Sequence, residues 1–180
     1  MDSGSIFQII ILIILLLLSA FFSSAETALT TVNRIRMRSL AEDGNSRAAC
    51  VLKVTDDSGK MLSAILIGNN IVNLSASSIA TSLALDLWGS VGAGIATGIL
   101  TLLILIFGEI SPKTIAAINA EKISLSYCNI IYWLMKLLTP VIFILNKLSI
   151  AFLFLLRVDP NAKDLSLIHI SEPTRPLYIS

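Results

Sequence analysis

Long apolar runs alternate with short polar stretches along this chain. Three of the runs, at residues 6–25, 61–87 and 91–118, reach the length of roughly 20 residues that a helix needs to cross a bilayer. The short sequence Trp88-Gly89-Ser90 separates the second run from the third and predicts a tight turn. The pattern therefore predicts an all-α membrane protein with three transmembrane helices.

The first run also has the length of a signal-peptide core. Secretory signals begin with a positively charged segment, and residues 1–5 contain no Lys or Arg. We therefore interpret residues 6–25 as a transmembrane helix of the mature protein.

A fourth apolar stretch, residues 123–156, is interrupted by Lys136 and Lys147. These lysines are eleven residues apart, which puts them on nearly the same face of a helix. A basic stripe on an apolar helix is typical of a segment that lies along the membrane surface, so we favour a broken juxtamembrane, interfacial helix pair. The alternative is a fourth transmembrane helix with a buried Lys136, and Pro140 could kink either version.

Composition supports a membrane protein and argues against several other classes. Charged residues make up 14% of the chain, whereas a soluble domain carries about 25%. The net charge of +1 does not point to nucleic acid as a partner, so the expected surroundings are the lipid bilayer. Cys50, Cys128 and His169 lack the spacing of a metal site, and no His or Lys base accompanies a serine nucleophile, so we expect no enzyme.

Basic residues are unevenly distributed between the connections. Residues 1–5 and 86–90 have none, and the connection at residues 33–60 has six. Because positively charged connections stay in the cytoplasm, we expect a multi-pass protein of the cell membrane with its N-terminus outside. The six basic residues of the connection are Arg34, Arg36, Arg38, Arg47, Lys53 and Lys60.

Polar side chains inside the apolar runs are costly and indicate function. Ser19 and Ser23 share one face of the first helix, and Asn69 and Asn73 share one face of the second, because each pair is four residues apart. With a rise of about 1.5 Å per residue, both pairs and Glu109 of the third helix come to similar depths in the inner half of the bilayer.

Pro112 follows Glu109 and lacks a backbone N–H, so it frees the carbonyl of Gly108. Carboxylate, hydroxyl, amide and carbonyl oxygens together form the ligand set that hard cations such as Mg²⁺ select. Two structural alternatives remain: Lys113, four residues from Glu109, could neutralise it, and the asparagines could simply join helices.

Three segments resemble the transmembrane domain of the cyclin-M/CorC family of magnesium transporters. They are LSAFFSSAETAL at residues 18–29, GNNIVN at 68–73 and FGEISPK at 107–113, in the family's order. The resemblance implies a homodimer that moves Mg²⁺, with Na⁺ as the coupling ion for efflux in several members. By position it implies metal ligands from the side chains of Ser19, Ser23, Asn73 and Glu109 and from the carbonyl of Gly68, with Asn69 beside it.

The end of the chain has a different character. LSLIHISEPTR at residues 165–175 resembles a translated sequencing adapter, so we expect residues 165–180 to be non-native. The transmembrane domain then occupies residues 1–160. The family resemblance implies a pair of CBS modules further downstream, which this sequence does not contain.

Two functions are consistent with these features. The first is the transmembrane domain of an Mg²⁺ transporter that exports the ion in exchange for Na⁺. The alternative is a non-conducting membrane anchor or sensor scaffold for a cytoplasmic regulatory domain.

Overall fold

A computed structural model of the chain describes residues 3–155, which form helices and the short connections between them. The chain divides after Thr139 into two compact units. The first contains helices α1 to α6, and residues 140–155 of helix α7 (Thr139–Leu155) are the described part of the second. The described residues form helices and no strands, so the predicted all-α class is confirmed.

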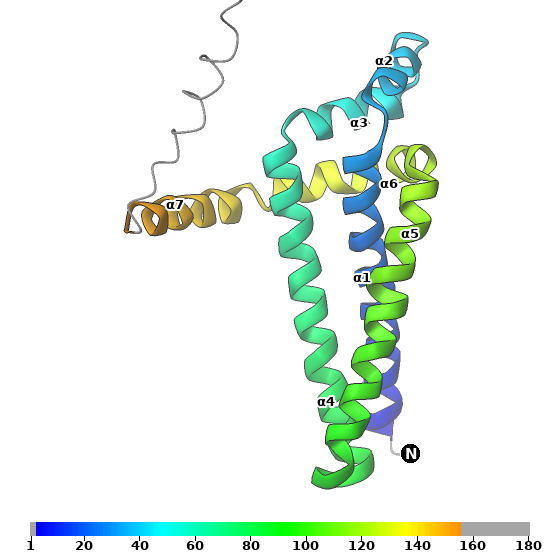
Figure 1. The fold of residues 1–180 in the computed structure, drawn as a ribbon, viewed down its shortest axis with the longest axis vertical. Helices are drawn as coiled ribbons and strands as arrows, with labels where there is room; N and C mark the ends of the chain where they lie inside the picture. Colours follow the sequence, from blue (N-terminus) through cyan, green and yellow to red (C-terminus); the bar gives the residue numbers. More distant parts are fainter. Residues whose placement is uncertain (1–2, 156–180) are drawn as a thin grey trace, which may run out of the picture. The chain divides into compact units, whose positions relative to one another are not determined.

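Three long helical segments run side by side in the first unit (Figure 1). They come from α1 (Ser3–Thr31), from the two halves of α4 (Ser58–Ile104), and from the π-helical turn η1 (Leu105–Ile110) with α5 (Ser111–Ile118). The segments that are long and apolar enough to cross a membrane are Gly4–Thr31, Ser58–Gly89 and Gly94–Ile118. The prediction of three transmembrane helices is confirmed.

The predicted turn at Trp88-Gly89-Ser90 is confirmed as a sharp break inside α4. Gly89 has φ +65° and ψ −170°, whereas its neighbours are helical. A positive φ is unfavourable for residues with a Cβ atom, so glycine is the residue that suits this reversal. The chain thereby turns back into the third transmembrane segment.

The third segment is less regular than a single helix over residues 91–118. Its middle forms the wide turn η1, in which the N–H of Ser111 donates to the carbonyl of Ile106, five residues earlier. Proline after this turn is consistent with the irregularity, because Pro112 cannot donate to the preceding turn. Single π-helical turns occur often at functional sites.

The polar connection at residues 33–60, for which the sequence predicted no helices, folds into α2 (Arg34–Glu42) and α3 (Ser46–Asp56). Asn33 accepts hydrogen bonds from two N–H groups in the first turn of α2, and Asn45 does the same for α3. Asparagine is among the best N-terminal caps, so these short helices have a local cause.

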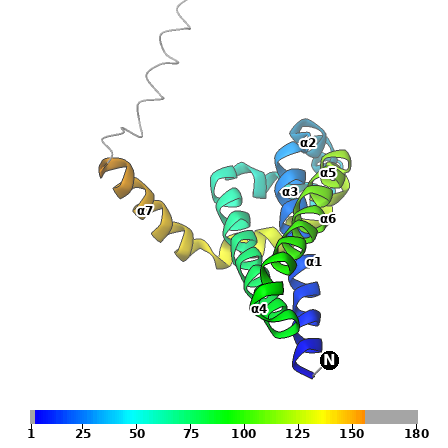
Figure 2. The ribbon, with the colours of Figure 1, turned by 60° about the horizontal axis from the view of Figure 1, so that its bottom comes forward.

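Helix α3 packs on α6 (Ala120–Leu137). The buried side chains of α3 include those of Val51 and Val54, and the buried side chains of α6 include those of Cys128, Ile131 and Met135. Figure 2 shows that α2, α3 and α6 gather at one end of the three long segments, opposite the N-terminus. The first unit therefore consists of a three-helix bundle with a helical cap.

The last apolar stretch is interrupted, as predicted, and the break falls at Leu138, between α6 and α7. Within α7, the Nζ atom of Lys147 lies 4.6 Å from the ring centroid of Phe143. The interfacial position of this stretch stays a prediction. Residues 165–180, the expected non-native tail, lie outside the described residues.

Candidate cation site

A pocket of about 140 Å³ lies between the three transmembrane segments, near the middle of their length. Three of the residues predicted as ligands, Ser19, Asn73 and Glu109, contribute to its wall. The first comes from α1, the second from α4 and the third from η1. The complete lining is Ser19, Asn73, Ser77, Thr101, Ile104, Leu105 and Glu109.

Ser19 joins the three segments. Its hydroxyl is fully buried and lies 2.7 Å from Oδ1 of Asn73 and 3.3 Å from the carbonyl oxygen of Gly108. A Cβ atom on Gly108 would come within 3.1 Å of the Ser19 hydroxyl oxygen, so glycine permits this approach. The Gly108 carbonyl therefore accepts a bond from another helix, in agreement with the expected effect of Pro112.

Two further predicted ligands, Ser23 and Asn69, are buried but do not line the pocket. The Oγ atom of Ser23 and the Oδ1 atom of Asn69 have no hydrogen-bond partner among the described residues. Buried polar atoms without a partner are uncommon in folded proteins. Both atoms retain the capacity to bind a ligand or a water molecule.

Gly68 lies where the backbone of α4 packs against the Phe22 ring of α1. A Cβ atom there would lie 2.6 Å from Cε1 and Cζ of Phe22. Gly68 is buried and is not part of the pocket wall. In the structure its evident role is to let the Phe22 ring pack against the backbone of α4.

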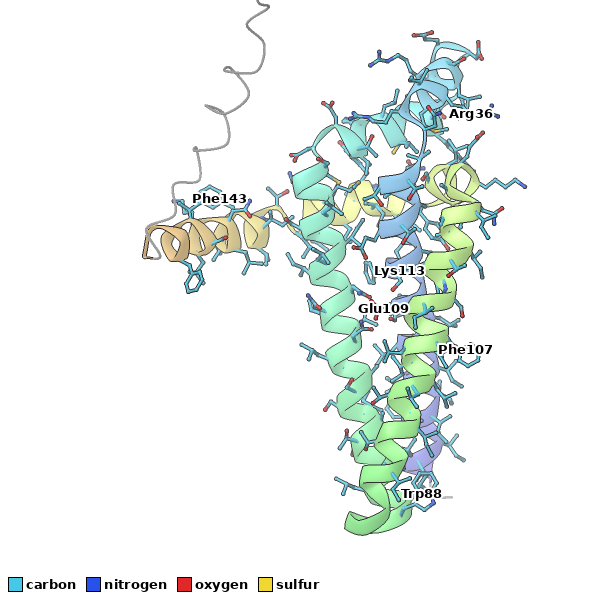
Figure 3. All side chains as sticks on the ribbon, in the orientation of Figure 1. Arg36, Trp88, Phe107, Glu109, Lys113 and Phe143 are labelled. Atoms are coloured by element: carbon cyan, nitrogen blue, oxygen red, sulfur yellow. The ribbon has the colours of Figure 1, made fainter. Side chains whose placement is uncertain are left out.

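Glu109 carries the only carboxylate among the described residues that line the pocket. Its Oε1 atom lies 3.3 Å from Nζ of Lys113, so the intrahelical ion pair considered above does form. The same Nζ atom lies 3.4 Å from Oε2 of Glu26 on α1. Figure 3 shows Glu109 and Lys113 on the side of the third segment that faces α1 and α4, with Phe107 on the opposite side.

Two residues of the pocket wall, Ser77 and Thr101, were not predicted from the sequence. The ion pair between Glu26 and Lys113 was not predicted either. Ser77 follows Asn73 by four residues, so the helical spacing that singled out Asn69 and Asn73 could also have found it. No comparable signal links Glu26 to Lys113, because they are brought together only by helix packing.

The polar groups of the pocket wall are three hydroxyls, one amide and one carboxylate, and they lie beside the apolar side chains of Ile104 and Leu105. Within residues 3–155, no group of three or more His, Cys, Asp or Glu side chains lies close enough together to hold a metal. A volume of about 140 Å³ has room for about four waters at roughly 30 Å³ each. The arrangement therefore suits a hard cation that keeps part of its water shell, as Mg²⁺ commonly does.

The fold defines a helical membrane domain with a pocket between its transmembrane segments. Residues 10–170 match the family described as the cyclin M transmembrane N-terminal domain. This match covers most of the chain, and the chain belongs to this family. The resemblance expected from the three sequence segments is thereby confirmed.

Several relatives match most of this chain. The chain is 47% identical over 126 residues to a UPF0053 protein of Haemophilus influenzae, and the match covers 70% of this chain. It is 42% identical over 129 residues, or 72% of the chain, to the UPF0053 inner membrane protein YfjD of Escherichia coli. A chloroplastic DUF21 domain-containing protein of Arabidopsis thaliana is 37% identical over 136 residues, 76% of this chain and 21% of that protein. The matches span 30% of the length of the two bacterial relatives.

Proposed function

We propose that this chain is the transmembrane part of a divalent-cation transporter that carries Mg²⁺ outward in exchange for Na⁺. The observation that carries the proposal is the pocket between the three transmembrane segments, whose wall includes the oxygen-bearing residues Ser19, Asn73 and Glu109. A carboxylate at this depth is unfavourable without a function, because charges inside a bilayer cost several kcal/mol.

The proposed site uses one charged ligand and several neutral ones. Glu109 supplies the negative charge, and the oxygens of Ser19 and Asn73 complete the inner part of the shell. Ser23, Asn69 and the Gly68 carbonyl, which lie outside the pocket wall, belong to the proposed path of the ion rather than to the pocket itself. The unpartnered atoms of Ser23 and Asn69 support this assignment.

The orientation and the assembly are part of the same proposal. The N-terminus lies outside the cell, and the basic cap formed by α2 and α3 lies in the cytoplasm, which follows the distribution of Lys and Arg. Two copies associate as a homodimer through their transmembrane segments. Small residues at Gly94 and Gly98 provide one surface on which helices can approach closely.

The test is Glu109→Gln, which removes the charge and keeps the shape of the side chain. In proteoliposomes loaded with an Mg²⁺-sensitive dye, we expect the wild-type chain to move Mg²⁺ and Glu109→Gln to abolish that flux. Glu42→Gln is the matched control, because Glu42 is exposed on α2, outside the pocket.

Unchanged flux in Glu109→Gln would overturn the assignment of Glu109. A wild-type flux equal to that of empty vesicles would instead support the non-conducting anchor. Replacing internal or external Na⁺ by choline tests the exchange, since the proposal requires the flux to fall when the Na⁺ gradient is removed.

A further inference from the structure

Lys113 holds two carboxylates that come from different transmembrane segments. Its Nζ atom lies 3.3 Å from Oε1 of Glu109 and 3.4 Å from Oε2 of Glu26. The side chains are partly shielded, with exposed fractions of 36% for Lys113, 35% for Glu109 and 26% for Glu26. One ammonium group thus neutralises half of the negative charge that the two carboxylates carry together.

This contact bears directly on the pocket, because Glu109 also forms part of the pocket wall. A cation in the pocket needs the oxygen atoms of Glu109, and one of them already faces the ammonium group of Lys113. Two cations close to one carboxylate repel each other, and the repulsion is larger in a poorly hydrated site than in water. The transported ion and Lys113 therefore compete for the carboxylate of Glu109.

We propose that the ammonium group of Lys113 competes with the transported ion for the carboxylate of Glu109. When the ion binds to Glu109, Lys113 remains paired with Glu26. This inference rests on the proposed function and adds two positioning residues to it. When the cargo reaches Glu109, the lysine shifts its contact to Glu26, a carboxylate already 3.4 Å from it. When the cargo leaves, the lysine returns to Glu109.

A lysine that competes with the ion for Glu109 favours release of the ion, which transport requires. A transported ion must bind strongly enough to enter and weakly enough to leave. A lysine next to the only carboxylate in the described pocket wall lowers the affinity for the ion and stabilises the ion-free site. Without it, two carboxylates on neighbouring helices would face each other uncompensated after the ion departs.

The first test is Lys113→Met, which keeps the apolar stem of the side chain and removes its charge. Titration of the detergent-purified chain with MgCl₂ in a calorimeter measures the dissociation constant. We expect Lys113→Met to bind Mg²⁺ about fivefold more tightly than the wild type, since a partly exposed ion pair contributes up to about 1 kcal/mol. Lys113→Arg keeps the charge and should retain a dissociation constant close to that of the wild type.

A purely structural role for Lys113 gives the opposite sign. If the lysine only holds α1 to the third segment, its removal should disorder the pocket and weaken binding. Lys113→Gln, which has a polar end of similar reach, replaces Lys113→Met if the latter does not purify as a folded protein. An equal or weaker affinity in the folded neutral variant would overturn the inference.

Glu26 is tested by a double-mutant cycle. In the wild-type background, Glu26→Gln should weaken Mg²⁺ binding, because Lys113 then stays on Glu109. In the Lys113→Met background, the same substitution should weaken binding less, since no lysine remains to be relocated and only the through-space attraction of the Glu26 charge is lost. An equal loss of affinity in both backgrounds would mean that Glu26 acts on the ion independently of Lys113 and would overturn its role as the partner of Lys113.

These outcomes separate the inference from the function on which it rests. If the wild type shows no Mg²⁺ binding or transport, the proposed function itself fails. If the wild type binds Mg²⁺ and Glu109→Gln does not, the proposed site stands, and only the sign of the change in Lys113→Met decides whether the lysine competes with the ion.

Discussion

Gly68 allows the sharpest prediction about the helix packing beneath the pocket. In Gly68→Ala, the new methyl carbon would lie 2.6 Å from two ring atoms of Phe22 and 3.2 Å from a third. The ring is 9% exposed and lies edge-on against Phe21, whose ring centroid is 5.3 Å away, so it has little space to retreat.

The magnitude follows from two opposing terms. Overpacking a buried contact typically costs about 1–3 kcal/mol, and replacing glycine by alanine within a helix returns up to about 1 kcal/mol. We therefore expect Gly68→Ala to lose about 1–2 kcal/mol of unfolding free energy. For a chain of this size, that loss lowers the thermal midpoint by roughly 2–8 °C.

The assay is thermal unfolding of the detergent-purified protein, followed by circular dichroism. Gly59→Ala is the matched control, because Gly59 lies on the same helix and a Cβ atom there meets nothing within 4 Å. It should leave the midpoint unchanged or raise it. In the Gly68→Ala background, Phe22→Leu should restore part of the lost stability.

A midpoint for Gly68→Ala equal to that of Gly59→Ala would refute the steric argument. A Phe22→Leu substitution that lowers the midpoint equally in the wild-type and in the Gly68→Ala background would show that the two sites are not in contact.

Four further substitutions test other parts of the first unit. Ser19→Ala removes a 2.7 Å hydrogen bond between helices and should lower stability by about 1–3 kcal/mol in the same assay. Ser24→Ala should cost less, since the Ser24 hydroxyl bonds only to the backbone of its own helix. Asn45→Ala removes the cap of α3 and should cost about 1 kcal/mol, measured by chemical unfolding. In Cys50→Ser, the remaining thiol should react slowly with a charged maleimide at pH 8 and faster at higher pH, because the Cys128 side chain is buried and burial raises the pKa of its thiol. Rapid modification of that variant at pH 8 would contradict the buried position of Cys128.

The helical cap shows how a local signal can be present and still be missed. Residues 33–60 are polar and carry six basic side chains, which hid two short helices from a prediction based on apolar runs. Asn33 and Asn45 are the signals that could have found them, since asparagine is a common cap of short helices. The packing of α3 against α6 then required apolar partners from a segment far along the chain.

The sequence predicted the depth of the candidate ligands along their helices, but it did not predict which of them line the same pocket. Counting residues along each helix placed Ser19, Asn73 and Glu109 at similar heights, and all three reach one pocket. The same argument placed Ser23 and Asn69 beside them, whereas the structure leaves both outside the pocket wall. A difference of four residues along a helix moves a side chain by about 6 Å, which is enough to separate two sites.

By itself, the sequence determined the properties that depend on one helix at a time. The length of an apolar run decides whether a segment can cross a bilayer, and a glycine such as Gly89 marks where the chain can reverse. The tertiary structure alone decided how each helix is rotated and how far it is displaced against its neighbours. Those two quantities depend on side chains that pack between helices, such as Phe22 against Gly68. They bring Lys113 within reach of Glu26 as well as Glu109, and that shared contact cannot be found on any single helix.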